Sequence, residues 1–267
     1  MIDNFTFKTK YSMDDLLEII RLLRSPDGCP WDREQTHESI KKNFIEETYE
    51  VVEAINKDNP DMLREELGDV LMQILLHCQM EREKDTFTFD DVINELAQKL
   101  IIRHPHVFGS EHCETAEEVL VTWDRVKTET KHQKSVTDAM CAVPKELPAL
   151  MRAQKVQKKA AKVGFDWQEV SGALEKVHSE CDEVLDAMHN KTQNDVNEEL
   201  GDLLFSCVNV ARFVGADAEE SLSMATEKFI QRFAIVEELA NNRNIDMKQA
   251  SLSKLDELWD EAKELTK

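Results

Sequence analysis

The feature that most constrains the fold of this 267-residue chain is an internal repeat of an acidic motif. The sequence Glu-Glu-Leu-Gly-Asp occurs at residues 65–69 and again at residues 198–202, an offset of 133 positions. Because five landmarks keep the same order in both halves, the chain is predicted to contain two copies of one unit. Small insertions change the offset between some of the other matched pairs. The four other pairs are Gly28–Trp31 with Gly164–Trp167; Glu47 and Glu50 with Glu180 and Glu183; Lys99 and Arg103 with Lys228 and Arg232; and Trp123–Lys127 with Trp259–Lys263.

The boundary between the copies is predicted from proline. Each half is long enough to bury a core of its own. Pro144 and Pro148 disfavour a continuous helix through the segment that joins the halves. We therefore expect an N-terminal helical repeat at residues 1–130, a linker at 131–148 and a C-terminal helical repeat at 149–267.

Composition and periodicity both favour helices. Only 7 Gly and 6 Pro occur, which leaves few of the tight turns that a sheet-rich fold needs. Apolar residues recur at helical spacing from Ile40 to Asn56, and a second helix is expected after Asn59-Pro60-Asp61, with Asp61 as its cap. The second copy repeats this pattern from Val177 to His189 and from Asp195 to Phe213. We predict an all-α fold, a tandem repeat of a unit like a four-helix bundle, with one hairpin of acidic helices in each copy.

The repeated acids are predicted to hold a metal ion. Residues three apart lie on one side of a helix, so each hairpin presents carboxylates from both of its helices together. Such carboxylates near a core boundary need a cation, and a set of oxygen ligands selects Mg²⁺, with Mn²⁺ as the alternative. The bound metal would lower the pKa of a water for attack on phosphorus, with a free carboxylate as base. The predicted ligands are Glu47, Glu50, Glu66 and Asp69 in the first copy and Glu180, Glu183, Glu199 and Asp202 in the second.

Cations for a phosphate-bearing substrate occur downstream in the second copy. Lys228 and Arg232 share one helical face, and Trp259 and Lys263 are spaced i, i+4. Trp259 could stack on a base or belong to the core, and the spacing leaves both open. Lys155 lies in the one basic stretch of the chain, which is more typical of a solvated helix face than of a phosphate site.

Two other pairs of repeated residues have a structural and a functional interpretation. Trp31 and Trp167 precede the first acidic helix of each copy and are interpreted as core anchors, with a base pocket as the alternative. Gly68 and Gly201 each cost about 1 kcal/mol inside a helix. Their presence in both copies therefore indicates a function or a close helix contact.

Charge and composition exclude several classes of protein. The net charge of −21 opposes direct binding to a nucleic-acid backbone. No stretch approaches the roughly 20 apolar residues that span a bilayer, and the first residues lack the apolar run of a signal peptide. The 6 Cys are scattered without a CxxC pair, which is typical of reduced thiols. We expect a cytoplasmic protein that binds neither membrane nor nucleic acid.

Several short motifs occur in a fixed order along the chain. They are Gly-Cys-Pro-Trp-Asp (28–32), Glu-Glu-Thr-Tyr-Glu (46–50), both copies of Glu-Glu-Leu-Gly-Asp, Arg-His-Pro-His-Val-Phe (103–108) and Lys-Val-Gly-Phe-Asp-Trp (162–167). In combination they resemble the MazG-type nucleoside triphosphate pyrophosphohydrolases across nearly the whole chain. The resemblance implies an all-α fold, an intertwined homodimer and Mg²⁺-dependent hydrolysis of NTPs or dNTPs, ATP among them, to monophosphate and pyrophosphate. It also implies house-cleaning of nucleotide pools or modulation of a stress response.

Site residues follow from the same resemblance. It implies that the second copy is catalytic and that the first is degenerate or serves assembly. One residue departs from the family's motif, because the leading glutamate is present as Glu46 in the first copy but is Ser179 in the second. The implied metal ligands are Glu180, Glu183, Glu199 and Asp202, and the implied nucleotide contacts are Lys228, Arg232, Trp259 and Lys263.

Two other functions fit parts of the sequence. Glu-x-x-His occurs at residues 34–37, 129–132 and 175–178 and is the spacing of di-iron carboxylate bundles. The histidine at 178 has Ile45 as its counterpart, however, so it is not part of the repeat. A non-catalytic helical protein that recruits a basic partner is the other alternative, and turnover of any NTP would exclude it.

Overall fold

The computed structural model describes residues 5–130 and 135–266 and contains, within them, thirteen helices and no β-strand. The predicted all-α class is confirmed. The chain divides into two units, Met1–Lys127 and Thr128–Lys267. Among the described helices, none is both long enough and apolar enough to cross a bilayer.

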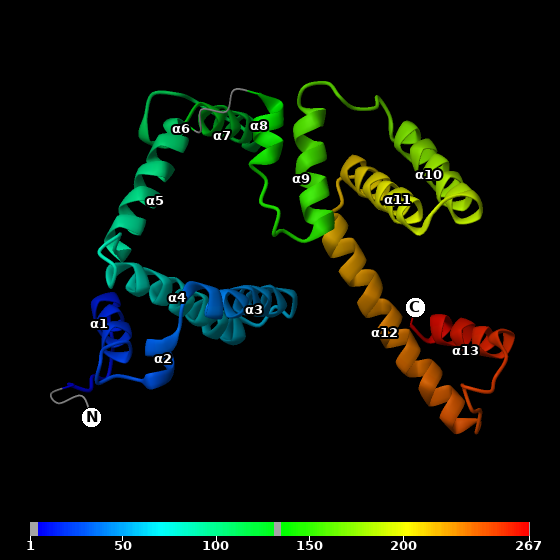
Figure 1. Cartoon of the computed structure of the whole chain (residues 1–267), viewed down its shortest axis with the longest axis horizontal. Helices are drawn as coiled ribbons and strands as arrows, with labels where there is room; N and C mark the ends of the chain where they lie inside the picture. Colours follow the sequence, from blue (N-terminus) through cyan, green and yellow to red (C-terminus); the bar gives the residue numbers. More distant parts are fainter. Residues whose placement is uncertain (1–4, 131–134, 267) are drawn as a thin grey trace. The chain divides into compact units, whose positions relative to one another are not determined.

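The first unit is organised around the hairpin of α3 (His37–Asn56) and α4 (Pro60–Arg82), which lie side by side in Figure 1. A core forms where α1 (Met13–Leu23) packs on this hairpin. Its fully buried members are Ile20, Ile40, Leu75, Leu76 and Met80. The other helices of this part of the chain are α2 (Pro30–Glu34), α5 (Phe89–Arg103), α6 (Pro105–Phe108) and α7 (Ala116–Thr130).

The second unit contains the matching hairpin, α10 (Val170–Asn190) with α11 (Gln193–Phe213), and α9 (Ala149–Ala161) packs against α11. A second hairpin pairs α12 (Ala218–Asn242) with α13 (Leu252–Leu265). Its core consists of Val236, Ala240, Leu258 and Ala262.

The predicted hairpin helices exist in both copies, but their starts lie earlier than predicted. The prediction of Asp61 as a cap was wrong, because the side chain of Asn59 accepts from the backbone N–H groups of Asp61 and Met62. Proline at the first helical position lacks a donor, so the residue before it takes the capping role. In α3, a reciprocal cap between Thr36 and Ser39 starts the helix ahead of the first apolar residue.

The predicted linker at 131–148 falls in the second unit. Residues 131–134 lie outside the described residues, and the histidine at 132 is one of them. The following segment holds the short helix α8 (Val136–Cys141), which Ser135 caps and which packs against α9.

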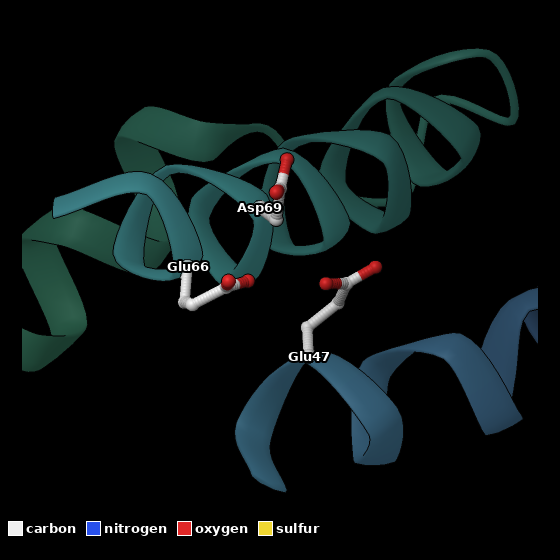
Figure 2. A group of neighbouring side chains, drawn as sticks. All are labelled: Glu47, Glu66 and Asp69. Carbon is white, nitrogen blue, oxygen red and sulfur yellow. The ribbon is translucent and has the colours of Figure 1, made fainter. Parts of the chain in front are cut away.

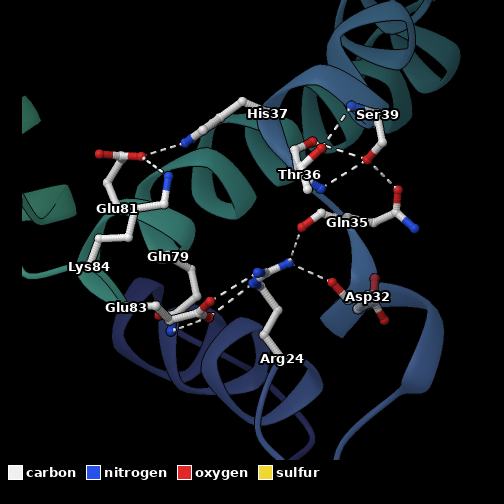
Figure 3. Close-up of polar contacts among 10 residues, drawn as sticks. All are labelled: Arg24, Asp32, Gln35, Thr36, His37, Ser39, Gln79, Glu81, Glu83 and Lys84. Carbon is white, nitrogen blue, oxygen red and sulfur yellow. Dashed lines mark hydrogen bonds and ion pairs between the residues drawn. The ribbon is translucent and has the colours of Figure 1, made fainter.

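A buried arginine connects three segments of the first unit (Figure 3). Arg24, 9% exposed at the end of α1, donates two hydrogen bonds of 2.9 Å to the carboxylate of Glu83 after α4. Its third nitrogen donates to the backbone carbonyls of Asp32 and Gln35, at 2.5 and 3.2 Å. The guanidinium thus fixes the segment from α2 to α3 against the hairpin.

We predict that Arg24→Met lowers the free energy of unfolding by about 1–3 kcal/mol, because two carbonyls lose this donor and the Glu83 carboxylate keeps only the donor from Gln79. Arg21→Met is the matched control, since Arg21 pairs with Glu18 at the surface and such pairs contribute about 0–1 kcal/mol. Urea unfolding of both variants measures the difference. Equal losses in the two variants would contradict this role of Arg24.

Candidate functional site

Three carboxylates of the first copy converge between α3 and α4. Figure 2 shows Glu47 on α3 pointing toward Glu66 and Asp69 on α4. One oxygen from each of these residues lies within 4.8 Å of the others. All three side chains are half-buried, so the group lies at the edge of the helix contact. We call these residues the first cluster.

The second copy forms the same arrangement between α10 and α11. Glu180, Glu199 and Asp202 each place one oxygen within 4.8 Å of the other two, and we call these residues the second cluster. Glu180 is only 2% exposed, and its Oε2 atom is buried without a hydrogen-bond partner. Because a buried carboxylate oxygen normally has a donor or a metal, this atom indicates a place for a cation.

The fourth predicted ligand of each copy lies outside these groups. Glu50 is half-buried on α3 and is not a member of the first cluster. Glu183, on α10, accepts a hydrogen bond of 2.9 Å from the hydroxyl of Ser179. Ser179, which stands where the first copy has Glu46, therefore positions Glu183. Neither cluster includes a histidine.

Lysines distinguish the second cluster from the first. Lys176 forms an ion pair with Glu180 and lies 3.7 Å from Glu183, and Lys191 lies 3.0 Å from Glu199. At the offset of 133, their counterparts in the first copy are Asn43 and Asp58. The second cluster is therefore partly neutralised by this chain's own cations, whereas the first has no lysine at either equivalent position.

The pKa values of the first cluster reflect this difference. Desolvation raises the pKa of Glu47 to about 6, and the carboxylates of Glu50, Asp69 and Glu66 add to the rise. The pKa of Glu66 is also raised, first by desolvation and then by neighbouring acids. A divalent cation bound there would oppose both shifts, because it favours the charged form of each carboxylate.

A cavity of about 360 Å³ opens next to the second cluster. Glu180 and Asp202 line it, together with residues of α9, α11 and the segment before α10. In the first unit, a cavity of about 170 Å³ is lined by residues of α1, α4 and α5 and by none of the first cluster. The second copy thus combines carboxylates with room for a ligand.

The predicted substrate contacts lie elsewhere in the second unit. Lys228, Arg232, Trp259 and Lys263 all belong to the α12–α13 hairpin, and none of them lines this cavity. Trp259 packs on Phe229 with ring centroids 5.1 Å apart. Lys155 is exposed on α9 and does not line the cavity either. Within one chain, these residues are not gathered around the second cluster.

The tryptophans interpreted as core anchors are not buried. Trp31 is 57% exposed and Trp167 is 44% exposed, so that interpretation was wrong. Trp167 instead lines the cavity beside the second cluster. Sequence spacing cannot separate these outcomes, because a loop tryptophan can turn either toward the core or along a cavity wall.

The comparison with protein families identifies the repeated hairpins. A model described as the MazG nucleotide pyrophosphohydrolase domain matches residues 35–108 and again residues 168–236. The chain belongs to this family. Both matches include a complete acidic hairpin, so the repeat is a duplication of the MazG domain.

Two relatives match over almost their full length, and a third matches over half of its length. A Thermotoga maritima protein named nucleoside triphosphate pyrophosphohydrolase/pyrophosphatase MazG is 44% identical over 250 residues, which cover 94% of this chain and 95% of the relative. An Escherichia coli K12 nucleoside triphosphate pyrophosphohydrolase is 44% identical over 254 residues, covering 94% and 97%. The uncharacterized protein YabN of Bacillus subtilis is 47% identical over 250 residues, covering 92% of this chain and 50% of YabN.

Lys176 and Lys191 of this MazG-family chain were not predicted as site residues from the sequence. Lys176 stands four residues before Glu180, a spacing that brings the two side chains together on one helix face. This contact could therefore have been predicted from the spacing. The contact of Lys191 with Glu199 is harder to predict, because it crosses the turn between α10 and α11.

We predict that Glu47→Gln stabilises the metal-free protein above about pH 6 and has no effect below the ordinary range of a glutamate. A carboxyl whose pKa is raised in the folded state holds its proton more tightly when folded. Stability is therefore lost as the pH rises through that pKa, and an uncharged side chain avoids the loss.

Thermal unfolding of the metal-free parent and variant at about pH 8 and about pH 4 measures this effect. The exposed Glu34→Gln change is the control. A Glu47→Gln variant that unfolds at the parent's temperature at the higher pH would contradict the prediction.

Proposed function

We propose that this chain is a Mg²⁺-dependent nucleoside triphosphate pyrophosphohydrolase that converts NTPs or dNTPs, ATP among them, to the monophosphate and pyrophosphate. The observation that carries the proposal is the second cluster, where three carboxylates converge beside a cavity of about 360 Å³. The names of the two full-length relatives support the same activity.

The residues of the second cluster fit a hard divalent cation. Their donors are all carboxylate oxygens, which Mg²⁺ and Mn²⁺ prefer. The unpartnered Oε2 of Glu180 offers a ligand atom that no protein donor occupies. Glu180, Glu199 and Asp202 would hold the ion. When bound, Mg²⁺ supplies charge neutralisation of the triphosphate and a water of lowered pKa.

Lys176 and Lys191 are then available for the substrate. Both ammonium groups pair with second-cluster carboxylates in this structure. A carboxylate that ligates a metal no longer needs its lysine, so each ammonium can turn to a phosphate oxygen. Glu183 lies next to Lys176 and outside the cluster, which suits it to accept the proton of the attacking water.

A homodimer is part of the proposal. Monomeric proteins of 30.8 kDa expose about 12,000 Å², and two separate domains of half that mass about 14,000 Å². This chain exposes 19261 Å². On α12, Leu222, Phe229 and Ile230 are all more than half exposed. We propose that another copy of the chain covers these side chains in a dimer. The cations on α12 and α13 of one copy would then lie beside the second cluster of the other copy.

The physiological proposal follows from the substrate. An enzyme that cleaves nucleoside triphosphates acts on the cytoplasmic pool, where it would remove unwanted nucleotides or limit a stress response. We therefore retain the prediction of a cytoplasmic protein.

The activity is tested by the release of pyrophosphate and orthophosphate from an NTP and dNTP panel, with and without Mg²⁺. We expect pyrophosphate from the parent only with the metal. Glu199→Gln should lower kcat by about a hundredfold or more, because it removes a ligand of the activating ion. Glu66→Gln is the matched control in the first copy and should retain turnover.

Two results would contradict this assignment. Absence of pyrophosphate release by the parent would exclude the enzyme. Loss of turnover only in Glu66→Gln would move catalysis to the first copy.

Sedimentation equilibrium tests the dimer. We expect twice the mass of 30.8 kDa for the parent and a shift toward the monomer for Ile230→Glu, since a charge would be buried in the contact. The neighbouring exposed residue provides the control Gln231→Glu, which should remain dimeric. A monomeric parent would contradict the dimer.

A further inference from the structure

We propose that the cavity beside the second cluster is a nucleobase subsite in which the indole of Trp167 stacks on the base and Gln157 contacts its polar edge. The proposal rests on the proposed function and deepens it. It assigns base binding to residues of α9, α11 and the loop before α10, instead of to the α12–α13 hairpin.

The position of the cavity limits what it can hold. Glu180 and Asp202 form one side of it, so a triphosphate at the second cluster leaves the rest of the nucleotide within reach of the cavity. Its volume of about 360 Å³ is within the range of small-ligand sites. Aromatic, small apolar, polar and charged side chains line the remainder. The aromatic and amide groups among them suit a flat heteroaromatic ring with polar edges.

Trp167 is held in place for a stacking role. Gly172, in the first turn of α10, lies directly under the indole, and a Cβ there would fall 2.4 Å from the Cδ1 atom of Trp167. Any other residue at position 172 would displace the ring. The ring therefore lies against α10 while remaining 44% exposed along the cavity.

An ion pair fastens the loop that carries this tryptophan. Arg212 on α11 donates to Asp166 at 2.5 Å, and the same carboxylate oxygen accepts from the backbone N–H of Trp167 at 2.9 Å. The first copy lacks this connection, since Pro30 precedes Trp31 and Gln79 stands at the position of Arg212. Only the second copy, whose carboxylates line a cavity, therefore holds its tryptophan in place by this ion pair.

Buried polar side chains form the other part of the lining. Gln157, Ser206 and Asn209 are each 7% exposed. Gln157 donates from Nε2 to the carbonyl of Phe205 at 2.7 Å, which fixes the orientation of its amide. Its Oε1 is left buried without a partner. An acceptor in that state costs free energy unless a ligand donates to it, and the exocyclic amine of adenine or cytosine is such a donor.

Steady-state pyrophosphate release by the full chain tests the subsite, with ATP, CTP, GTP and UTP as substrates and inorganic tripolyphosphate as a competitor without a base. Trp167→Ala should raise KM for every NTP by about five- to a hundredfold, the usual contribution of base stacking on an aromatic ring. The kcat and the inhibition constant of tripolyphosphate should not change. Trp167→Phe should restore most of the affinity, and Trp31→Ala is the control.

Gln157→Leu gives an independent measure. It should reduce the preference for ATP and CTP over UTP, because uracil carries a carbonyl where adenine and cytosine carry the amine that loses its acceptor. Unchanged KM in Trp167→Ala, or an equal loss of tripolyphosphate binding, would overturn the subsite while leaving the proposed function intact. Absence of turnover by the parent would overturn both. Circular dichroism of each variant shows whether a loss comes from misfolding.

Discussion

Electrostatic repulsion between carboxylates held at a helix contact is the constraint on which the other features of this chain depend. Packing of α3 on α4, and of α10 on α11, brings three acids within 4.8 Å of one another in each copy. Helix packing is favourable, but the repulsion between the carboxylates that it brings together is unfavourable. Each hairpin therefore needs cations that offset this repulsion. The two copies differ in how it is supplied.

In the second copy the compensation comes from lysine, and in the first copy the lysines are absent. Lys176 and Lys191 pair with the second cluster, whereas burial and repulsion raise the pKa of Glu47 to about 6. A lysine can be displaced by a metal and then bind phosphate. The same second copy has the cavity that Trp167 lines, so the lysine compensation and the cavity belong to one copy.

The hairpins could be predicted from the sequence because helical periodicity and an offset of 133 positions are local signals. Convergence of the acids followed from that spacing. The position of Trp167 could not be predicted, since it depends on how closely the indole approaches Gly172 in space. The contact of Lys191 with Glu199 crosses a turn, and the capping of α4 by Asn59 replaces the predicted Asp61. These features depend on tertiary geometry or on proline chemistry, which periodicity does not report.

Mn²⁺ binding followed by electron paramagnetic resonance shows whether the first and second clusters are the divalent-cation sites that we predict. The parent would be titrated beside Glu66→Gln, Glu199→Gln and the double variant. We expect each single variant to lose Mn²⁺ binding at one cluster and the double variant to lose it at both. A double variant that binds Mn²⁺ as the parent does would show that neither cluster is a cation site.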